Sequence, residues 1–470
     1  MIKLGPRLVI AGTHSGVGKT TVATGLMAAL RSSGLQVASA KVGPDFIDPG
    51  YHSVATGRPP RNLDAWMCGA HSLGPLAGRA SAGADVLVIE GVMGLFDGSV
   101  EIVPEGGLAT GSTAELAALL GAPVILVVDA ASMSASVGAL IYGYMTFHPS
   151  VQVHGVVLNR VGSDVHEQLL REALAGLPVP IVGVIRRHDA LTWRDRHLGL
   201  IPVAEQPGLV ADSIALLGEV IASSCDLQSI MTIARTAPSR EVDDVRMPKQ
   251  IGRVRIAVAG GAAFSFTYPD NLEALTAAGA EILPFDPLRD SDLPDGTDAV
   301  IIGGGFPEEH AASLAANTPL LSAMRRRLHT RLSSGLNTGL STGLVVWAEC
   351  GGLLWLTDGL TDHDGQRHEM VGAVTGEGVM TRRLTLGYRT ATIRQPNPLG
   401  ETGLVLRGHE FHYSVVRPGG EALALGSRFT DRLEGFASSN LLATYLHVHL
   451  GAAPELAETF VRRVLGSKHP

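Results

Sequence analysis

The sequence predicts two α/β domains, each built around a mostly parallel sheet with helices on its faces. In the N-terminal half, short apolar runs alternate with helical patterns, which is typical of a parallel sheet covered on both sides. A second alternation of the same kind begins after residue 252, beyond a charged stretch that has no periodicity. The length of 470 residues also exceeds that of one ordinary domain.

Five apolar runs in the N-terminal half have the length and the β-branched composition of buried strands. Helical patterns lie between several of them, so the strands are expected to run parallel. The expected strands are 7–11, 37–42, 86–90, 124–129 and 153–159.

The domain boundary is expected where periodicity is lost, charge collects and prolines appear, within 223–249. We therefore expect a first domain at 1–240, a linker at 241–252 and a second domain at 253–470. In the second domain, the apolar runs predict strands at 253–259 and 299–302 and a helix at 270–278.

Composition narrows the class of protein. A net charge of −8 argues against a nucleic-acid binder that relies on a basic surface. Cys68, Cys225 and Cys350 are widely separated, which fits neither a disulfide framework nor a structural zinc site. The apolar run 116–131 is broken by glycine and proline, so it predicts a helix and a buried strand rather than a membrane span. We expect a soluble cytoplasmic protein without a signal peptide, and a homo-oligomer is compatible with the sequence.

The segment 12–21, GTHSGVGKTT, follows a strand and opens a helix, as a nucleotide phosphate loop does. Its glycines permit a tight backbone path, Lys19 supplies positive charge and Thr20 supplies a hydroxyl for magnesium. Thr13 stands where the strict pattern has glycine, and the alternative is a glycine-rich turn without ligand. The Lys-Thr-Thr sequence favours the nucleotide. The candidate nucleotide-binding residues here are Gly16, Gly18, Lys19, Thr20 and Thr21.

Carboxylates follow two of the expected strands, at the sheet edge where open α/β folds bind ligands. Glu90 ends one strand, and Asp45 and Asp48 follow another. Oxygen ligands suit Mg²⁺, which predicts a magnesium site for ATP, although loop capping by Asp45 and Asp48 stays an alternative. Asn159, at the end of a further strand, is a candidate contact to the base or a simple turn residue.

Cys350 lies between an expected strand and two glycines, on a corner where a nucleophile would be exposed. The following helix N-terminus is expected to lower the pKa of the thiol, whereas the alternative is an inert buried cysteine. His447 and His449 are candidate bases, and spacing alone does not choose between them. The glycine turn at 303–305 could present amides to an oxyanion, with Gly304 and Gly305 as candidates.

Six longer segments resemble the cobyrinic acid and hydrogenobyrinic acid a,c-diamide synthase family, a branch of the ATP-dependent class I glutamine amidotransferases. The N-terminal half is also similar to dethiobiotin synthetase. The matching segments are 41–52 (KVGPDFIDPGYH), 61–64 (RNLD), 90–98 (EGVMGLFDG), 303–308 (GGGFPE), 348–352 (AECGG) and 408–414 (GHEFHYS).

The resemblance implies a P-loop NTPase-like doubly wound parallel sheet followed by a class I glutamine amidotransferase α/β domain. It implies that Cys350 is the nucleophile, that His447 activates it and that Asn159 lies near adenine. Many such enzymes carry glutamate two residues after the histidine, where this chain has His449, so a third catalytic member is not assigned. By the same carry-over, Thr20, Asp45 and Glu90 surround Mg²⁺. Tentative substrate residues are Asp48, Tyr51, Asp64, Asp97 and His197.

The implied reaction is amidation of two side-chain carboxylates of cobyrinate or hydrogenobyrinate in cobalamin biosynthesis. ATP would convert each carboxylate into an acyl phosphate, and ammonia released from glutamine would displace the phosphate. Because free ammonia is mostly ammonium at neutral pH, we expect an enclosed passage between the sites. Alternatives are another polycarboxylate, such as a nickel tetrapyrrole or a cobyric acid precursor, and a non-enzymatic P-loop switch ATPase. The expected partners are small molecules only.

Overall fold

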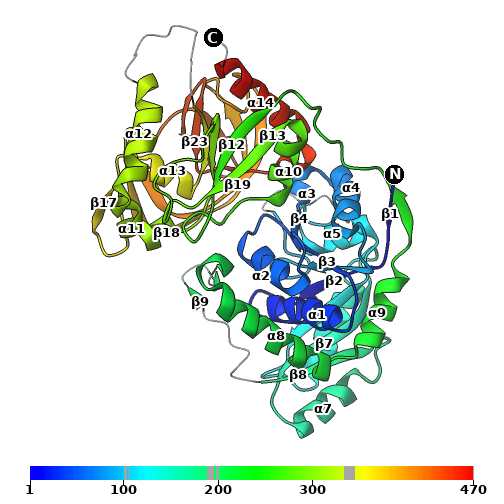
Figure 1. Ribbon diagram of the computed structural model, residues 1–470. Helices are drawn as coiled ribbons and strands as arrows, with labels where there is room; N and C mark the ends of the chain where they lie inside the picture. Colours follow the sequence, from blue (N-terminus) through cyan, green and yellow to red (C-terminus); the bar gives the residue numbers. More distant parts are fainter. Residues whose placement is uncertain are drawn as a thin grey trace. The chain divides into compact units, whose positions relative to one another are not determined.

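The computed structural model describes residues 1–99, 103, 105–187, 195–196, 199–200, 202–332 and 344–468. The chain separates into two compact units, Met1–Val245 and Arg246–Pro470, called here the N-terminal and C-terminal units (Figure 1). The linker proposed at 241–252 contains this division, and its first residues belong to strand β11 (Arg240–Val242). His197, one of the tentative substrate residues, lies outside the described residues.

The N-terminal unit is built on a seven-stranded parallel sheet in the order β4-β3-β5-β2-β6-β7-β8. The expected parallel α/β architecture is confirmed, and all five expected strands are present. Two edge strands, β4 and β8, were not expected. The strands are β2 (Arg7–Gly12), β3 (Val37–Val42), β4 (Arg61–Leu63), β5 (Val86–Glu90), β6 (Val124–Asp129), β7 (Val153–Val161) and β8 (Ile181–Arg186).

The strand order brings the candidate ATP-site segments together. Strand β5 lies between β3 and β2, and in this register Glu90 pairs with Lys41 on one side and Ile10 on the other. Because parallel strands end at the same sheet edge, the loops after β2, β3 and β5 meet there. All residues of these three strands are buried, so the sheet is a rigid support for that edge.

Helices cover both faces of this sheet, in keeping with its buried strands (Figure 1). Helix α1 packs closely on α8, since a Cβ at Gly25 would lie 2.5 Å from Ile221 and one at Gly218 would lie 3.1 Å from Ala28. The helices are α1 (Lys19–Ser32), α2 (Ile47–Thr56), α3 (Ala65–Cys68), α4 (Ala70–Ser81), α5 (Thr113–Leu120), α6 (Ser136–Thr146), α7 (Asp164–Leu174), α8 (Pro207–Ser224) and α9 (Leu227–Thr236).

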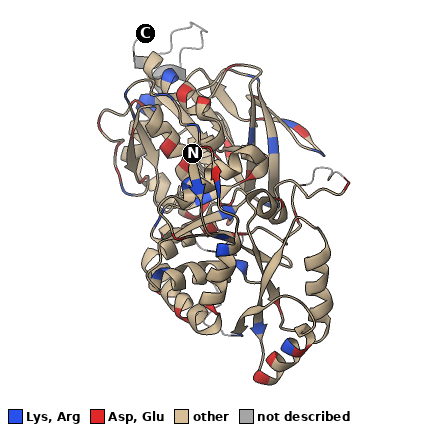
Figure 2. Cartoon of the chain, turned by 90° about the vertical axis from the view of Figure 1, so that its right-hand side faces the viewer, with Lys and Arg blue, Asp and Glu red and all other residues tan. Residues whose placement is uncertain are grey.

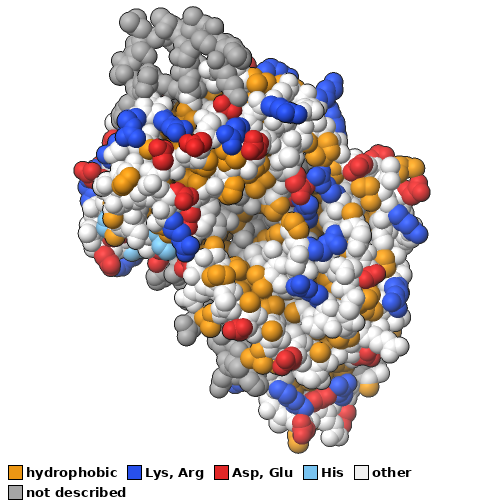
Figure 3. Space-filling view, viewed as in Figure 1, with side chains coloured by type: hydrophobic (Ala, Val, Ile, Leu, Met, Phe, Trp, Pro, Cys, Tyr) orange, Lys and Arg blue, Asp and Glu red, His pale blue; other side chains and the backbone are white. Residues whose placement is uncertain are grey.

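Among the described residues, α8 alone has the length and apolar composition that a membrane-crossing helix needs. Its buried side, which includes Ile214, Leu217 and Ile221, packs toward α1. This amphipathic packing is that of a helix on the surface of a globular core. Figure 3 shows acidic and basic side chains interspersed on the face that it presents, and Figure 2 shows acidic and basic residues scattered over the ribbon.

The C-terminal unit contains two sheets. The first has six strands in the order β13-β12-β14-β15-β23-β22, parallel except for β22. It includes the strands expected near 253–259 and 299–302, and the expected helix near 270–278 is α10 (Pro269–Ala278). Its strands are β12 (Val254–Ala259), β13 (Ala280–Phe285), β14 (Ala299–Ile302), β15 (Val345–Glu349), β22 (Phe436–Ser438) and β23 (Leu441–Thr444).

The second sheet has seven strands and is mostly antiparallel; the sequence analysis did not anticipate it. Its centre is the long pair β18 (Glu377–Ile393) and β19 (Val405–Arg417), and β19 also pairs with β24 (His447–Val448). The other strands are β16 (Gly359–Thr361), β17 (Arg367–Glu369), β20 (Leu423–Gly426) and β21 (Asp431–Glu434). The helices are α11 (Ala311–Ala316), α12 (Thr318–Leu332), α13 (Gly351–Leu356) and α14 (Pro454–Lys468).

Candidate active sites

The phosphate loop joins β2 to α1 in the N-terminal unit. Gly16 and Gly18 have φ values of 82° and 95°, a left-handed conformation that side chains disfavour. Lys19 is the first residue of α1, and its Nζ lies 3.2 Å from the carbonyl oxygen of His14. The ammonium therefore folds back over the loop, where a nucleotide phosphate would meet both the lysine and the loop amides.

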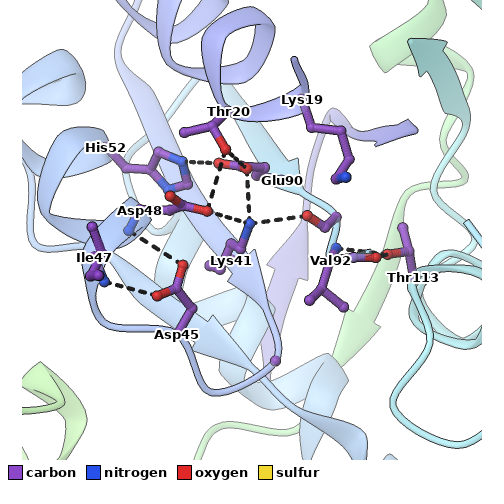
Figure 4. A network of polar contacts seen from close by, with 12 residues as sticks. Lys19, Thr20, Lys41, Asp45, Ile47, Asp48, His52, Glu90, Val92 and Thr113 are labelled. Carbon is purple, nitrogen blue, oxygen red and sulfur yellow. Dashed lines mark hydrogen bonds and ion pairs between the residues drawn. The ribbon is translucent and has the colours of Figure 1, made fainter. Parts of the chain in front are cut away.

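A buried cluster of charged groups lies beside the loop, at the ends of β3 and β5 (Figure 4). The Thr20 hydroxyl donates to Glu90 Oε1 at 2.6 Å and lies 3.4 Å from Asp48 Oδ2. Lys41 Nζ donates to Asp48 Oδ2 at 2.6 Å and to Glu90 Oε1 at 2.8 Å. His52 Nε2 is 2.6 Å from Glu90 Oε2. One threonine, two carboxylates, one lysine and one histidine thus meet around a point next to Lys19.

The electrostatics of this cluster depend on Lys41. Burial opposes its charge, but the carboxylates of Asp48 and Glu90 raise the pKa of Lys41 above its usual value. Burial likewise opposes the charge of Glu90, yet Lys41 and His52 hold the Glu90 pKa well below normal. Burial and repulsion from Glu90 raise the pKa of Asp48. Burial and Lys41 lower the pKa of Lys19 to about 8, so its charge is costly until an anion arrives.

The structure places the expected magnesium ligands unequally. Thr20, Glu90 and Asp48 lie together, whereas the Asp45 carboxylate accepts hydrogen bonds from the amides of Ile47 and Asp48 at 2.9 and 3.3 Å. Asp45 therefore caps the start of α2, which is the alternative that the sequence left open. Among the described residues, no three His, Cys, Asp or Glu side chains are grouped to hold a metal by themselves.

Other expected residues also have structural contacts. Asn159 Nδ2 donates to the carbonyl oxygen of Val17 at 2.8 Å, so Asn159 supports the phosphate loop from β7. Asp64 Oδ1 accepts from the amides of Trp66 and Met67 and caps α3. Asp97 Oδ2 accepts from the Gly94 amide at 2.9 Å, but the residue is exposed. Thr21 follows Thr20 on α1, and Tyr51 is buried on α2.

Two groups of this site were missed by sequence reasoning, namely Lys41 and His52. Both lie in the segment 41–52 that carries the resemblance, but neither was given a role. The available signal was the placement of Lys41 next to Glu90 at the ends of neighbouring strands. A buried lysine at such a point needs a carboxylate partner.

The cysteine corner of the C-terminal unit joins β15 to α13. Cys350 has φ 50° and ψ −103°, a strained conformation for a residue with a side chain. The Cys350 amide donates to the carbonyl oxygen of Thr444 at 2.7 Å, which fixes the corner to β23. A Cβ at Gly351 would lie 2.9 Å from Pro307, so the corner needs glycine there. The expected strand-to-helix corner is present, but Cys350 is buried there rather than exposed as expected.

The state of the thiol differs from the expectation. Cys350 is 6% exposed, and burial raises the pKa of its thiol, with further contributions from Glu308, Glu349 and Glu410. The Gly351 amide opposes this rise but does not outweigh it. The expected thiol activation by the helix N-terminus is therefore wrong for this state of the protein. Cys350 needs a base to take its proton.

The glycine turn 303–305 lies against the cysteine corner. The Gly352 amide donates to the carbonyl oxygen of Gly303 at 3.1 Å. A Cβ at Gly351 would lie 3.1 Å from the Gly305 nitrogen, and one at Gly304 would lie 3.3 Å from His447 Nε2. The turn thus borders both the nucleophile corner and the histidine, which is where donors to an oxyanion are needed.

The contacts of the two histidines distinguish them. His447 lies on β24, opposite His409 of β19, and its Nδ1 is 3.2 Å from Glu349 Oε2. His449 Nδ1 instead accepts from the Gly451 amide at 3.1 Å, and its Nε2 is 3.8 Å from Asp270 Oδ2. His447 therefore faces the glycine turn beside Cys350, while His449 is engaged with the residues that follow it and with α10.

The β19 segment 408–414 forms a wall of the cysteine site. Cys350 Sγ lies 4.0 Å from the carbonyl oxygen of Phe411. Glu410 is buried, accepts from Arg389 Nε at 2.7 Å and also pairs with Arg432. The His412 ring stacks on Tyr445 with centroids 3.7 Å apart. The segment 408–414, one of the six that carry the resemblance, thus packs around the nucleophile.

Glu434 is a second buried carboxyl group near this corner, and it makes a stability prediction possible. It accepts from the Thr444 hydroxyl and from the Tyr445 amide. Burial raises its pKa from 4.5 to about 7. Between these two pH values the unfolded chain releases a proton that the folded chain keeps, so this group's contribution to stability is lost as pH rises through 7.

We therefore expect Glu434→Gln to stabilise the C-terminal unit at pH 8 relative to the wild type, by up to roughly 3 kcal/mol. Well below pH 4.5, where Glu434 is protonated in both the folded and the unfolded wild type, the advantage should vanish. Urea unfolding of the full chain at several pH values measures this. A pH-independent difference between the two proteins would contradict the burial of an ionising carboxyl group.

Together, the phosphate loop and the cysteine corner define a class of protein, a glutamine amidotransferase joined to a nucleotide-binding domain. Comparisons with known families agree on both halves. Residues 8–201 match the family described as the CobQ/CobB/MinD/ParA nucleotide binding domain, and residues 255–455 match the CobB/CobQ-like glutamine amidotransferase domain.

Curated relatives identify the branch. The chain is 45% identical to the hydrogenobyrinate a,c-diamide synthase of Streptomyces coelicolor, over 97% of each chain. It is 42% identical to the cobyrinate a,c-diamide synthase of a Synechococcus species, over 97% of each chain, and 39% identical to that of Priestia megaterium, over 98% of each. The chain belongs to the cobyrinate/hydrogenobyrinate a,c-diamide synthase family and is a glutamine-dependent ligase.

Proposed function

We propose that the chain amidates the a- and c-side-chain carboxylates of cobyrinate or hydrogenobyrinate, with ATP and glutamine, in cobalamin biosynthesis. The observation that supports this proposal is the presence of two distinct candidate sites in one chain, one at the phosphate loop and one at the cysteine corner. A phosphate loop with a buried charged cluster serves carboxylate activation, and a strained cysteine with a histidine beside a glycine turn serves glutamine hydrolysis. The names of the relatives supply the substrate.

In the ATP site, the loop amides and Lys19 hold the phosphates, and Lys41 anchors the carboxylates around them. Mg²⁺ fits the Thr20 hydroxyl with Glu90 and Asp48, because it typically uses one or two carboxylates and takes its remaining ligands from water and phosphate. When bound, the ion would neutralise phosphate charge. In this arrangement Asp45 holds the loop rather than the ion.

The γ-phosphoryl group passes to a substrate carboxylate, giving an acyl phosphate with a good leaving group. In the C-terminal unit, His447 takes the thiol proton of Cys350, and the thiolate attacks the amide carbon of glutamine. Ammonia leaves, and water hydrolyses the glutamyl thioester to glutamate. Ammonia then displaces phosphate from the acyl phosphate to give the side-chain amide. The Gly305 amide is the proposed donor to the oxyanion, because the Gly304 amide already donates to the carbonyl oxygen of Phe266 at 3.2 Å.

The burial and the contacts of the tentative substrate residues indicate which of them could touch the corrinoid directly. Asp97 is exposed and interacts electrostatically with Lys19, so it suits direct contact near the transferred phosphate. Tyr51 and Asp64 are buried, and Asp64 caps a helix, so they suit a supporting role. Asp48 belongs to the charged cluster. A cytoplasmic location is proposed as well, since the three cysteines are free and widely separated, which fits a reducing compartment.

A mass-spectrometric assay tests the proposal. The chain is incubated with ATP, Mg²⁺ and glutamine, and cobyrinate and hydrogenobyrinate are offered in parallel. Each amidation replaces a hydroxyl group by an amino group, and we expect two such replacements on at least one ring. The comparison of the two rings identifies the metal state that the enzyme accepts. Absence of product on both, with glutamate release intact, would overturn the substrate assignment.

A further inference from the structure

The histidine that serves Cys350 needs a group that fixes its orientation and its tautomer, and the position two residues further along the chain does not supply one. His449 occupies that position, and its two ring nitrogens face the Gly451 amide and Asp270. Its ring also packs on Tyr268, with centroids 4.7 Å apart. His449 therefore stabilises the local structure around α10.

A carboxylate reaches His447 from another element. Glu349 is the last residue of β15, directly before the nucleophile, and its Oε2 lies 3.2 Å from His447 Nδ1. Its other oxygen, Oε1, accepts from the Val448 amide at 3.1 Å. Both side chains are buried, with 8% and 2% of their surface exposed. The carboxylate is thus held from two directions and has little freedom to turn away.

We propose that Glu349 is the carboxylate that positions His447 in the glutaminase site. The strand that carries the nucleophile, β15, then also supplies the residue that acts with Cys350 and His447. This deepens the proposed function and rests on it. Nδ1–H of His447 donates to Glu349, which leaves Nε2 as the base. The Nε2 edge faces the glycine turn, since a Cβ at Gly304 would lie 3.3 Å from this atom.

The strained corner explains how adjacent residues can serve the same histidine. In a regular strand, neighbouring side chains point to opposite faces of the sheet. Cys350 leaves the strand conformation with φ 50°, so its side chain does not follow the alternation. Glu349 keeps its strand conformation opposite Thr444, the last residue of β23. Strand β24 of the second sheet begins with His447, three residues after Thr444 along the chain. The strain at Cys350 is thereby part of the site's construction.

Glu349 also matters because Cys350 is buried among acidic groups. Glu308, Glu410 and Glu349 itself disfavour a thiolate, and His409 stacks on His447 with centroids 4.9 Å apart. When the thiol proton moves to His447, the imidazolium forms in a buried site. The carboxylate of Glu349 stabilises that cation, and without it the proton transfer from sulfur becomes less favourable.

The first experiment compares glutamate release by the wild type, Glu349→Gln and Glu349→Asp in the full chain. We expect Glu349→Gln to lower kcat about 100-fold or more with little change in KM, because glutamine binding does not need the imidazolium. Glu349→Asp keeps the charge and should recover part of kcat. Glu434→Gln is the matched control, since it neutralises another buried carboxyl group of the same unit, and it should stay within threefold of the wild type.

A second readout separates positioning from folding. The rate at which iodoacetamide alkylates Cys350 is measured against pH. Replacing Glu349 by glutamine removes some repulsion from the thiolate, but it also removes the carboxylate in direct contact with the imidazolium, at 3.2 Å, and we expect this second effect to dominate. The Glu349→Gln profile should therefore move to higher pH, while that of Glu349→Asp stays near the wild type. Alkylation of the Cys350→Ala variant measures the reaction of the other two cysteines, which is subtracted. An unshifted profile, or glutaminase activity within threefold of the wild type in Glu349→Gln, would overturn the proposal.

The two proposals fail differently. Glutamate release needs no corrinoid, so a wrong substrate assignment leaves this test readable. Ammonia-dependent amidation by Glu349→Gln should match the wild type, because the ATP site is untouched. A parallel fall of glutamine-dependent and ammonia-dependent amidation in this variant would mean that Glu349 acts through the fold, which overturns the positioning role but leaves the proposed function standing.

Discussion

Replacing Cys350 by alanine should abolish glutamine-dependent amidation and leave ammonia-dependent amidation largely intact. The thiolate forms the glutamyl thioester, and no other cysteine substitutes for it, because Cys68 and Cys225 lie in the N-terminal unit and are buried. We expect a loss of at least about 10⁴-fold in glutamate release, the scale seen when a nucleophile is removed from such sites. Mass spectrometry with glutamine or ammonium chloride at pH 8.5 as nitrogen donor measures both activities.

Cys225→Ala is the matched control for this experiment. Cys225 is also buried, and burial raises its thiol pKa to about 12, so it resembles Cys350 in chemistry but has no histidine partner among its described contacts. This variant should keep both activities. A Cys350→Ala protein that ammonia cannot rescue would contradict the separation of the two sites.

The parallel sheets were predictable because their signals are local. Buried strands such as β5 and β6 are continuous apolar runs, and a short run of this kind is typical of a parallel strand that is buried on both faces of its sheet. The sheet around β18 and β19 was not predictable in the same way. Many residues of β18 are half-buried or exposed, so its alternation is weak, and its pairing with β19 is non-local.

The candidate sites could be predicted where a short motif by itself indicates a chemical role, as the phosphate loop and the cysteine before two glycines do. The structure brings Thr20 next to Glu90 and places His447 against the glycine turn that borders Cys350, while the catalytic roles of these residues stay predictions. The thiol pKa was mispredicted because a short motif shows the helix N-terminus but not the burial that opposes it. Glu349 was missed because sequence spacing points to His449, whereas the contact depends on how β15 and β24 are placed.

Lys19→Ala should abolish amidation with either nitrogen donor, in contrast to Cys350→Ala. The Lys19 ammonium lies over the phosphate loop, and without it the transferred phosphoryl group loses a direct cation. We expect synthesis to fall by about 10³-fold or more, a loss of roughly 4 kcal/mol of transition-state stabilisation. Glutamate release measured in the same samples should persist, which shows that the C-terminal unit is intact. Lys249→Ala, at an exposed lysine, is the control.

Stability separates Lys19 from its neighbour Lys41, although both amines are buried at the same sheet edge. Burial lowers the pKa of Lys19, so the fold gains little from its charge, and Lys19→Ala should unfold within a few degrees of the wild type. Asp48 and Glu90 raise the pKa of Lys41, so its contribution is fully present at pH 7. Lys41→Ala leaves two buried carboxylates without their cation, and such losses cost about 3–5 kcal/mol. Thermal unfolding at pH 7 should therefore show a large fall in Tm for Lys41→Ala only. Equal destabilisation by both variants would contradict the division between a lysine that serves the nucleotide and one that holds the site together.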